Sequence, residues 1–126
     1  MVLDKYTEEE WAGALRVVSS TISKCEKMQL KFAEGTSQHT LLKNRIKAMY
    51  ISKSLLTDEN GRDLYTKEEL IEALLPVSSI IGKCEKAQLK FAEGTSHHTR
   101  LKNILNAMYI SESSIQDEIS RARKRA

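Results

Sequence analysis

The 126-residue chain contains one helical unit twice, and this repetition constrains its fold more than any other feature. Sliding the sequence on itself by 59 residues matches 36 of the 54 positions from Tyr6 to Glu59 without a gap. The stretch KCEKMQLKFAEGTS at Lys24–Ser37 returns with one change at Lys83–Ser96. A chain of this length can bury enough surface for one stable domain. We therefore expect a single helical domain over residues 1–126, made of repeat 1 (about 4–59), repeat 2 (about 63–118) and a basic C-terminal tail (119–126).

Each repeat opens with the signature of a helix start. Thr7 and Thr66 are each followed three residues later by a glutamate, which is the pattern of a capping box. Apolar residues then recur at alternating spacings of four and three, which predicts a long amphipathic helix from Thr7 to Ala33 and its counterpart in repeat 2. The two expected stripes are Trp11, Leu15, Val18, Ile22, Cys25, Gln29 and Phe32, and Leu70, Leu74, Val77, Ile81, Cys84, Gln88 and Phe91.

A glycine ends each of these helices in the prediction. Gly35 and Gly94 can adopt the left-handed conformation just past a helix end, and one residue of the following Thr-Ser pair then caps a second helix. Each repeat is therefore an αα-hairpin. Because one hairpin cannot bury its stripe alone, we expect an all-α, antiparallel up-down-up-down four-helix bundle with pseudo-two-fold symmetry. Both Gly-Thr-Ser turns would then lie at the same end of the bundle.

The second helix of each hairpin is apolar on two sides. Its main face carries Leu42, Ile46, Met49 and Leu56, whereas Ile51 lies about half a turn away. Ile110 repeats this placement in the second copy. A helix of this kind needs two partners, which are either both neighbours within the bundle or a second protein molecule.

Two local features interrupt the regularity of the repeat. The polar segment from Thr57 to Asp63 joins the copies, and its Asn60-Gly61 pair predicts a turn. Pro76 replaces Val17 inside the third helix, where proline removes a backbone hydrogen bond and clashes with the carbonyl four residues earlier. We expect a kink or a restart of the helix there.

Polar or reactive residues on the buried stripe have structural interpretations. Cys25 and Cys84 are equivalent and fit small core residues, with a disulfide between them as the alternative. The cysteines lie too far along the helix from His39 to share a metal ion, so we expect no metal site. Gln29 and Gln88 are expected to pair with each other and to specify register, or to contact a ligand inside the bundle.

The turn motif GTSxHTxxKN is the best candidate site. A helix N-terminus presents free backbone N–H groups at the positive end of the helix dipole, and the motif adds hydroxyl, imidazole, amide and ammonium donors. This combination favours a phosphate-like or carboxylate ligand, although capping alone also explains the Thr and Ser. The candidate ligand-binding residues are Thr36, Ser37, His39, Thr40, Lys43, Asn44, Thr95, Ser96, His98, Thr99, Lys102 and Asn103.

Several function classes find no support in the sequence. We find no nucleophile–base or paired-carboxylate arrangement, so we expect neither an enzyme nor a cofactor. The net charge of +3 is diluted by interspersed glutamates and concentrated in the tail, which argues against nucleic acid as the partner. The chain has no signal peptide pattern and no long apolar run, and its cysteines suit a reducing compartment; we expect a cytoplasmic protein without membrane contact.

Two functional hypotheses follow. The first is a non-enzymatic binding or regulatory protein that binds or sequesters an anionic small molecule, phosphate- or nucleotide-like, at the two turns. The alternative is a protein–protein interaction or homo-oligomerisation module that uses the second apolar strip around Ile51 and Ile110.

Overall fold

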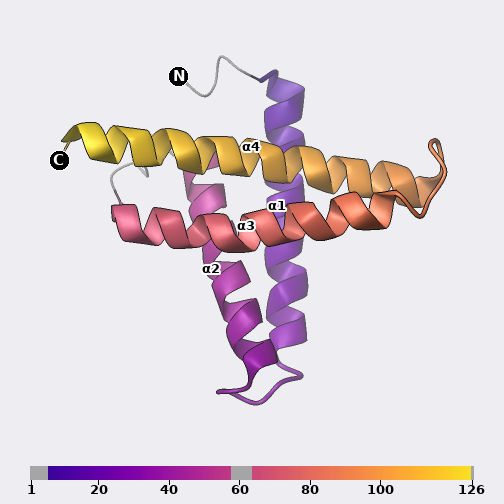
Figure 1. Cartoon of the computed structure of the whole chain (residues 1–126), viewed down its shortest axis with the longest axis horizontal. Helices are drawn as coiled ribbons and strands as arrows, with labels where there is room; N and C mark the ends of the chain where they lie inside the picture. The colour runs from indigo at the N-terminus through magenta and orange to yellow at the C-terminus, as the bar shows by residue number, and fades with distance from the viewer. Residues whose placement is uncertain (1–5, 58–63, 126) are drawn as a thin grey trace.

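The computed structural model describes residues 6–57 and 64–125, with the side chains of residues 123–125 excepted. This part of the chain forms four helices and no strand: α1 (Glu8–Gln29), α2 (Ser37–Thr57), α3 (Lys67–Gln88) and α4 (Ser96–Arg125). We call α1 with α2 hairpin 1, and α3 with α4 hairpin 2 (Figure 1). The predicted all-α class is confirmed.

The capping boxes form as the sequence predicts. The hydroxyl of Thr7 accepts a hydrogen bond from the Glu10 backbone N–H at 3.0 Å, and the Glu10 carboxylate accepts one from the Thr7 N–H at 2.9 Å. Thr66 and Glu69 make the same two contacts at 3.1 and 2.9 Å. Both first helices therefore start at equivalent positions of the repeat.

Helices α1 and α3 end four residues before the predicted point. The chain after Gln29 tightens into a turn, in which the N–H groups of Lys31 and Phe32 donate to carbonyls three residues earlier at 3.0 and 3.1 Å. We call residues 30–36 and 89–95 the tips of the hairpins. Gly35 and Gly94 lie within the tips and both have φ of 91°, so their left-handed conformation is confirmed.

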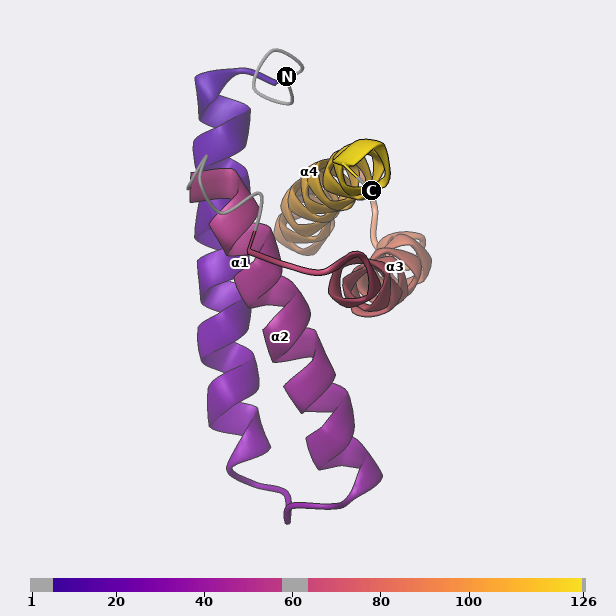
Figure 2. The same cartoon turned by 90° about the vertical axis from the view of Figure 1, so that its left-hand side faces the viewer.

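The two hairpins cross instead of lying along one axis. Hairpin 1 stands upright in Figure 1 while hairpin 2 runs horizontally across it, and Figure 2 shows α3 and α4 nearly end-on beside the upright hairpin 1. Between the hairpins, α1 contacts α4, and α2 contacts α3 and α4. The expected up-down-up-down arrangement with both turns at one end is therefore wrong.

Small residues at the crossing explain this geometry. Four alanines are at most 4% exposed and belong to one core cluster with the larger apolar side chains; they are Ala14, Ala48, Ala73 and Ala107. Small side chains let two helices approach closely at a steep crossing, where ridges of one helix enter grooves of the other. Beyond the crossing, Phe32 and Phe91 at the ends of the predicted stripes are exposed. The hairpins therefore share a core at the crossing and project freely toward their tips.

The second apolar strip of α2 and α4 is buried within this crossing. Ile51 is 2% exposed and Ile110 is 4% exposed, and both belong to the core cluster. Each of these helices thus packs both of its apolar faces against other helices of the molecule. Because both side chains are almost fully covered, these two isoleucines offer little apolar surface to a second molecule.

Two other predicted boundaries can be compared with the structure. Helix α3 continues through Pro76, so the expected restart is wrong. Residues 119–125, expected as a tail, continue α4, and Ile119 is 8% exposed and packs in the core. The predicted turn at Asn60-Gly61 lies outside the described residues.

Candidate functional site

The predicted turn sites use their threonines for helix capping. The Thr36 hydroxyl accepts from the His39 backbone N–H at 3.2 Å and donates to the Ala33 carbonyl at 2.7 Å. Thr95 makes the equivalent contacts at 3.2 and 2.8 Å. Because each hydroxyl proton is already donated within the tip, the threonines offer little to a ligand.

The two turns do not meet. One lies at the lower end of hairpin 1 and the other at the right-hand end of hairpin 2 (Figure 1). A joint pocket formed by the twelve candidate residues is therefore excluded. In hairpin 1, Asn44 alone of its six candidates lines one of the grooves described below. In hairpin 2, Ser96, Thr99 and Asn103 line a groove, whereas His98 and Lys102, again with Thr99, border an open hollow beside Gln88 at the end of α3.

The stripe glutamines brace their own hairpins. The Gln29 amide donates to the His39 carbonyl at 3.4 Å, and the Gln88 amide donates to the His98 carbonyl at 3.5 Å. The expected pairing of the two glutamines with each other is wrong. Each glutamine lies beyond the crossing, within its own hairpin. Their contacts hold the two helices of a hairpin together near the tip.

A tyrosine also bridges the helices of each hairpin. The Tyr50 hydroxyl donates to Glu26 at 3.0 Å, and the Tyr109 hydroxyl donates to Glu85 at 2.6 Å. Donation to a carboxylate stabilises the protonated phenol and raises the pKa of both tyrosines. These exposed bridges repeat in both copies and have a structural role.

Three hollows of the described surface are lined by residues of both hairpins. The α2/α3 groove has a volume of about 380 Å³. Eleven residues from these two helices line it: Leu41, Asn44, Lys47, Ala48, Ile51, Glu69, Glu72, Ala73, Leu75, Pro76 and Ser79.

A second groove lies between α4 and α1. It consists of two adjoining pockets of about 600 and 320 Å³ that share Arg16, Val17 and Asn103. Every one of the eleven residues of the α2/α3 groove has its 59-residue counterpart among the residues that line this α4/α1 groove. The two grooves are therefore built from equivalent positions of the repeat.

The grooves have the same floor and different rims. Six of the eleven pairs are identical, including Ala48 with Ala107 and Ile51 with Ile110. The five that differ are Leu41 with Arg100, Lys47 with Asn106, Glu72 with Gly13, Leu75 with Arg16, and Pro76 with Val17. Two leucines on one rim thus correspond to two arginines on the other.

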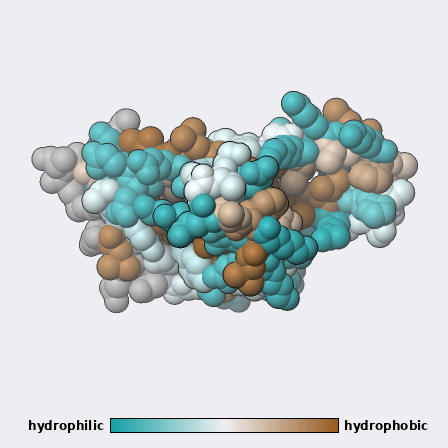
Figure 3. Space-filling model, turned by 90° about the horizontal axis from the view of Figure 1, so that it is seen from below, coloured by the Kyte–Doolittle hydropathy of each residue, from teal (hydrophilic) through white to brown (hydrophobic). Residues whose placement is uncertain are grey.

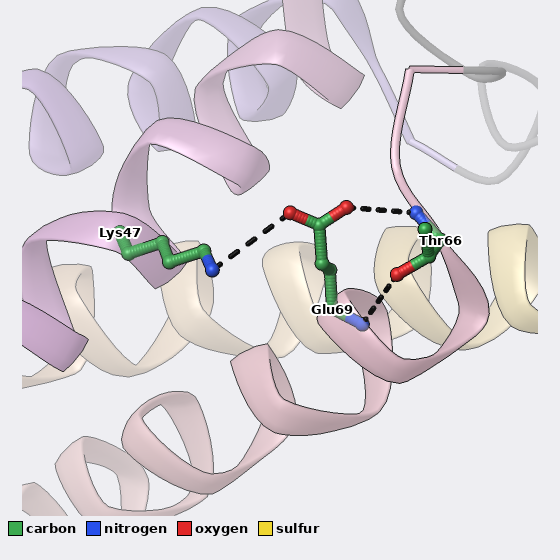
Figure 4. A network of polar contacts seen from close by, with 3 residues as sticks. All are labelled: Lys47, Thr66 and Glu69. Atoms are coloured by element: carbon green, nitrogen blue, oxygen red, sulfur yellow. Dashed lines mark hydrogen bonds and ion pairs between the residues drawn. The ribbon is translucent and has the colours of Figure 1, made fainter.

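An ion pair spans the α2/α3 groove. The Lys47 ammonium lies 3.7 Å from the Glu69 carboxylate, whose other oxygen accepts from the Thr66 N–H (Figure 4). The Thr66 backbone hydrogen bond, assisted by Lys47, lowers the pKa of Glu69 below its ordinary value of 4.5. Asn106 replaces the lysine in the other groove, so this bridge exists on one side of the molecule only.

The α4/α1 groove gathers three cations. Arg16 and Lys24 come from α1 and Arg100 from α4, and none of them makes an ion pair with another described residue. Hydroxyl groups of Ser96 and Thr99 line the same pocket. Glu9 and Glu10 line the adjoining pocket together with Arg16, whereas Lys24 and Arg100 line only the pocket that includes Gly94 in the tip of hairpin 2.

The cysteines are free thiols in a protected setting. Cys25 is buried and Cys84 is half-buried. Burial raises the pKa of both thiols, and the nearby Arg45 guanidinium acts in the opposite direction. Among the described residues no three His, Cys, Asp or Glu side chains are placed to hold a metal ion.

Comparisons with known proteins give no relative. No protein-family description, no curated protein and no solved structure matches the chain. None of the described helices is long and apolar enough to cross a membrane. The grooves therefore carry the functional proposal, and they were not predicted from the sequence. The signal that could have found them is the set of positions at which the two repeats differ.

Proposed function

We propose that this protein is a non-enzymatic binding protein that takes an anionic, phosphate-bearing small molecule in the α4/α1 groove. The observation that carries the proposal is the convergence of Arg16, Lys24 and Arg100, three cations without an ion-pair partner among the described residues. Arginine suits this task because its planar guanidinium binds phosphate oxygens in pairs. The hydroxyls of Ser96 and Thr99 supply further donors on the same side.

The orientation of the ligand follows from the charges along the groove. Its anionic group lies at the end formed by Lys24, Arg100 and the tip of hairpin 2, away from Glu9 and Glu10. The remainder of the ligand extends over Val17 toward the narrower pocket. Two pockets of about 600 and 320 Å³ are of the size that proteins use for small ligands and cofactors.

The proposed arrangement includes an approximate two-fold relation between the antiparallel hairpins. It is supported by the equivalent lining of the two grooves and by the equivalent contacts of α1 with α4 and of α2 with α3. In this view the duplication produced two like grooves, of which one became basic. We also infer a cytoplasmic location, which the two free cysteines support.

Thermal shift and calorimetric titration with pyrophosphate and a nucleotide panel test the proposal. A ligand at 100 times its Kd stabilises the folded state by about 2.7 kcal/mol, and the gain should fall as salt is added. The double variant Arg16→Leu with Arg100→Leu copies the rim of the α2/α3 groove and should abolish the shift. Absence of a shift for every anion with the unchanged protein would contradict the proposal.

The matched control is Lys43→Ala. It removes a cation from hairpin 1 that lies outside both grooves, so binding should be retained. If Lys43→Ala weakens binding as much as the arginine variant, general charge attraction and not the groove is responsible.

A further inference from the structure

The rim of the α2/α3 groove carries apolar side chains that no described part of the chain covers. Leu75 is 72% exposed and Leu41 is 51% exposed, and both line the groove. Ile71, one turn before Leu75 on α3, is 44% exposed. Single exposed apolar residues are ordinary on protein surfaces, but a group of them around one hollow marks an interaction surface.

The tips present apolar side chains of the opposite shape. Leu30 and Leu89 are 87% and 88% exposed, and each is followed two residues later by an exposed phenylalanine. Figure 3, seen from below, shows apolar residues both in the centre, where hairpin 1 points toward the viewer, and at the right, where hairpin 2 ends. A protruding leucine at a turn is a shape that fits into a groove.

Similarity between the repeats is greatest in and around these tips. From Lys24 to Asn44, 18 of 21 positions match their counterparts, against 18 of 33 in the rest of the compared region. Packing does not explain the retention of leucines that are almost fully exposed. A binding role shared by both tips does explain it.

Charge also matches tip to groove. Lys31 follows Leu30 in the tip and Lys27 lies in the last turn of α1, and their counterparts have the same places around Leu89. The α2/α3 groove offers the Glu72 carboxylate, which makes no ion pair with a described residue. It also offers the Glu72 carbonyl, which loses its usual helical donor because Pro76 has no N–H. A lysine ammonium is a suitable donor to both.

We propose that a hairpin tip of one copy of this chain docks in the α2/α3 groove of a second copy. The tip leucine inserts between Leu41 and Leu75, and a tip lysine pairs with Glu72. The α4/α1 groove does not accept a tip, because Arg100 and Arg16 stand where the leucines stand and repel the tip lysines. Each chain therefore has two tips and one acceptor groove.

This contact is heterologous, since it joins two different surfaces of the same chain. It extends beyond the proposed anion binding and uses the other groove. Two variants separate its two halves. Leu30→Ser with Leu89→Ser removes both tips, and Leu41→Arg with Leu75→Arg gives the acceptor groove the rim of its counterpart.

Sedimentation velocity over a concentration series tests the proposal. The unchanged protein should rise from the 14.3 kDa of one chain toward higher mass as its concentration increases. Either variant alone should stay at one chain. An equimolar mixture of the two should recover complexes of two chains, and of three chains where both tips of one chain are occupied, because the intact tips of one variant meet the intact groove of the other.

Leu64→Ser is the control, since Leu64 is 67% exposed but lies outside both tips and the groove. It should associate like the unchanged protein. Circular dichroism verifies that all variants remain helical, which is expected because every substituted residue is at least half exposed. Unchanged mass at all concentrations, or a mixture that stays at one chain, overturns the proposal.

Discussion

The α2/α3 and α4/α1 grooves have nearly the same floor, yet one rim is apolar and the other is basic. Ala48, Ala73 and Ile51 below the first groove match Ala107, Ala14 and Ile110 below the second. The rims differ where Leu41 and Leu75 correspond to Arg100 and Arg16. Within the two grooves, these buried positions are thus retained in both repeats, whereas the exposed rim positions Leu41 and Leu75 have diverged. The contrast between floor and rim separates the positions that the fold requires from those that set the chemical character of each groove.

Truncating the groove floors should have the largest effect. Ile51→Ala and Ile110→Ala each leave a cavity in the shared core and should each lower the free energy of unfolding by about 2–5 kcal/mol. Urea denaturation measures both. If the two losses differ by several kcal/mol, the comparison fails, because the two groove floors then contribute unequally to the stability of the core.

Removing a capping box should lower the free energy of unfolding by a smaller amount. Thr7→Ala and Thr66→Ala each delete one hydroxyl that caps a first helix beside a groove, at a cost of about 1 kcal/mol. Thermal unfolding monitored by circular dichroism gives the two values. Serine at the same positions should restore most of the loss, because it retains the hydroxyl; failure of that rescue would assign the effect to the threonine methyl group.

Replacing a glycine of the α4/α1 groove with alanine should raise the stability of the protein. Gly13 lies in helix α1, and a Cβ built there would lie 3.8 Å from the Arg16 guanidinium, which is ordinary contact. Gly13→Ala should raise the free energy of unfolding by about 0.5–1 kcal/mol, because alanine loses less backbone freedom on folding. Gly82→Ala, in helix α3 with open space around it, is the matched control and should gain equally. A loss of stability for Gly13→Ala alone would show that the Arg16 side chain cannot move away from the added methyl group.

The smallest expected effect is on how stability depends on acidic pH. The pKa of Glu69 is lowered in the folded state, so its contribution to stability is present above the ordinary value of 4.5 and is lost as the pH falls through the lowered pKa. Lys47→Ala removes one cause of that shift and should make stability slightly less dependent on pH below 4.5. Asn106→Ala in the other groove should leave the profile unchanged. Denaturation at a series of pH values compares the three proteins.

Local structure was predictable because its causes lie close together in the sequence. The capping box of Thr7 spans four residues, and the stripe through Val18 and Ile22 follows from helical periodicity. The left-handed glycines were found for the same reason. The early helix ends were not, because Phe32 continues the apolar spacing although it lies outside the core cluster.

The crossing angle and the grooves were not predictable in the same way. A periodic stripe states which face is buried but not at what angle two such faces meet, and the small residues Ala14 and Ala48 that permit a steep crossing carry little weight in an apolar pattern. Arg16 and Arg100 come from different repeats and meet only after the hairpins cross. The turn motif attracted the site prediction because its donors are adjacent in sequence, whereas the structure uses its threonines as caps.

Covalent linkage of the two copies has a consequence for how such a molecule can change. In a pair of separate, identical hairpins, one codon change would alter both clefts at once, and neither could acquire a charge without the other acquiring it. Within one polypeptide, the codon for Arg16 and the codon for Leu75 mutate independently. A fold built from two like halves can in this way acquire two grooves of different chemical character.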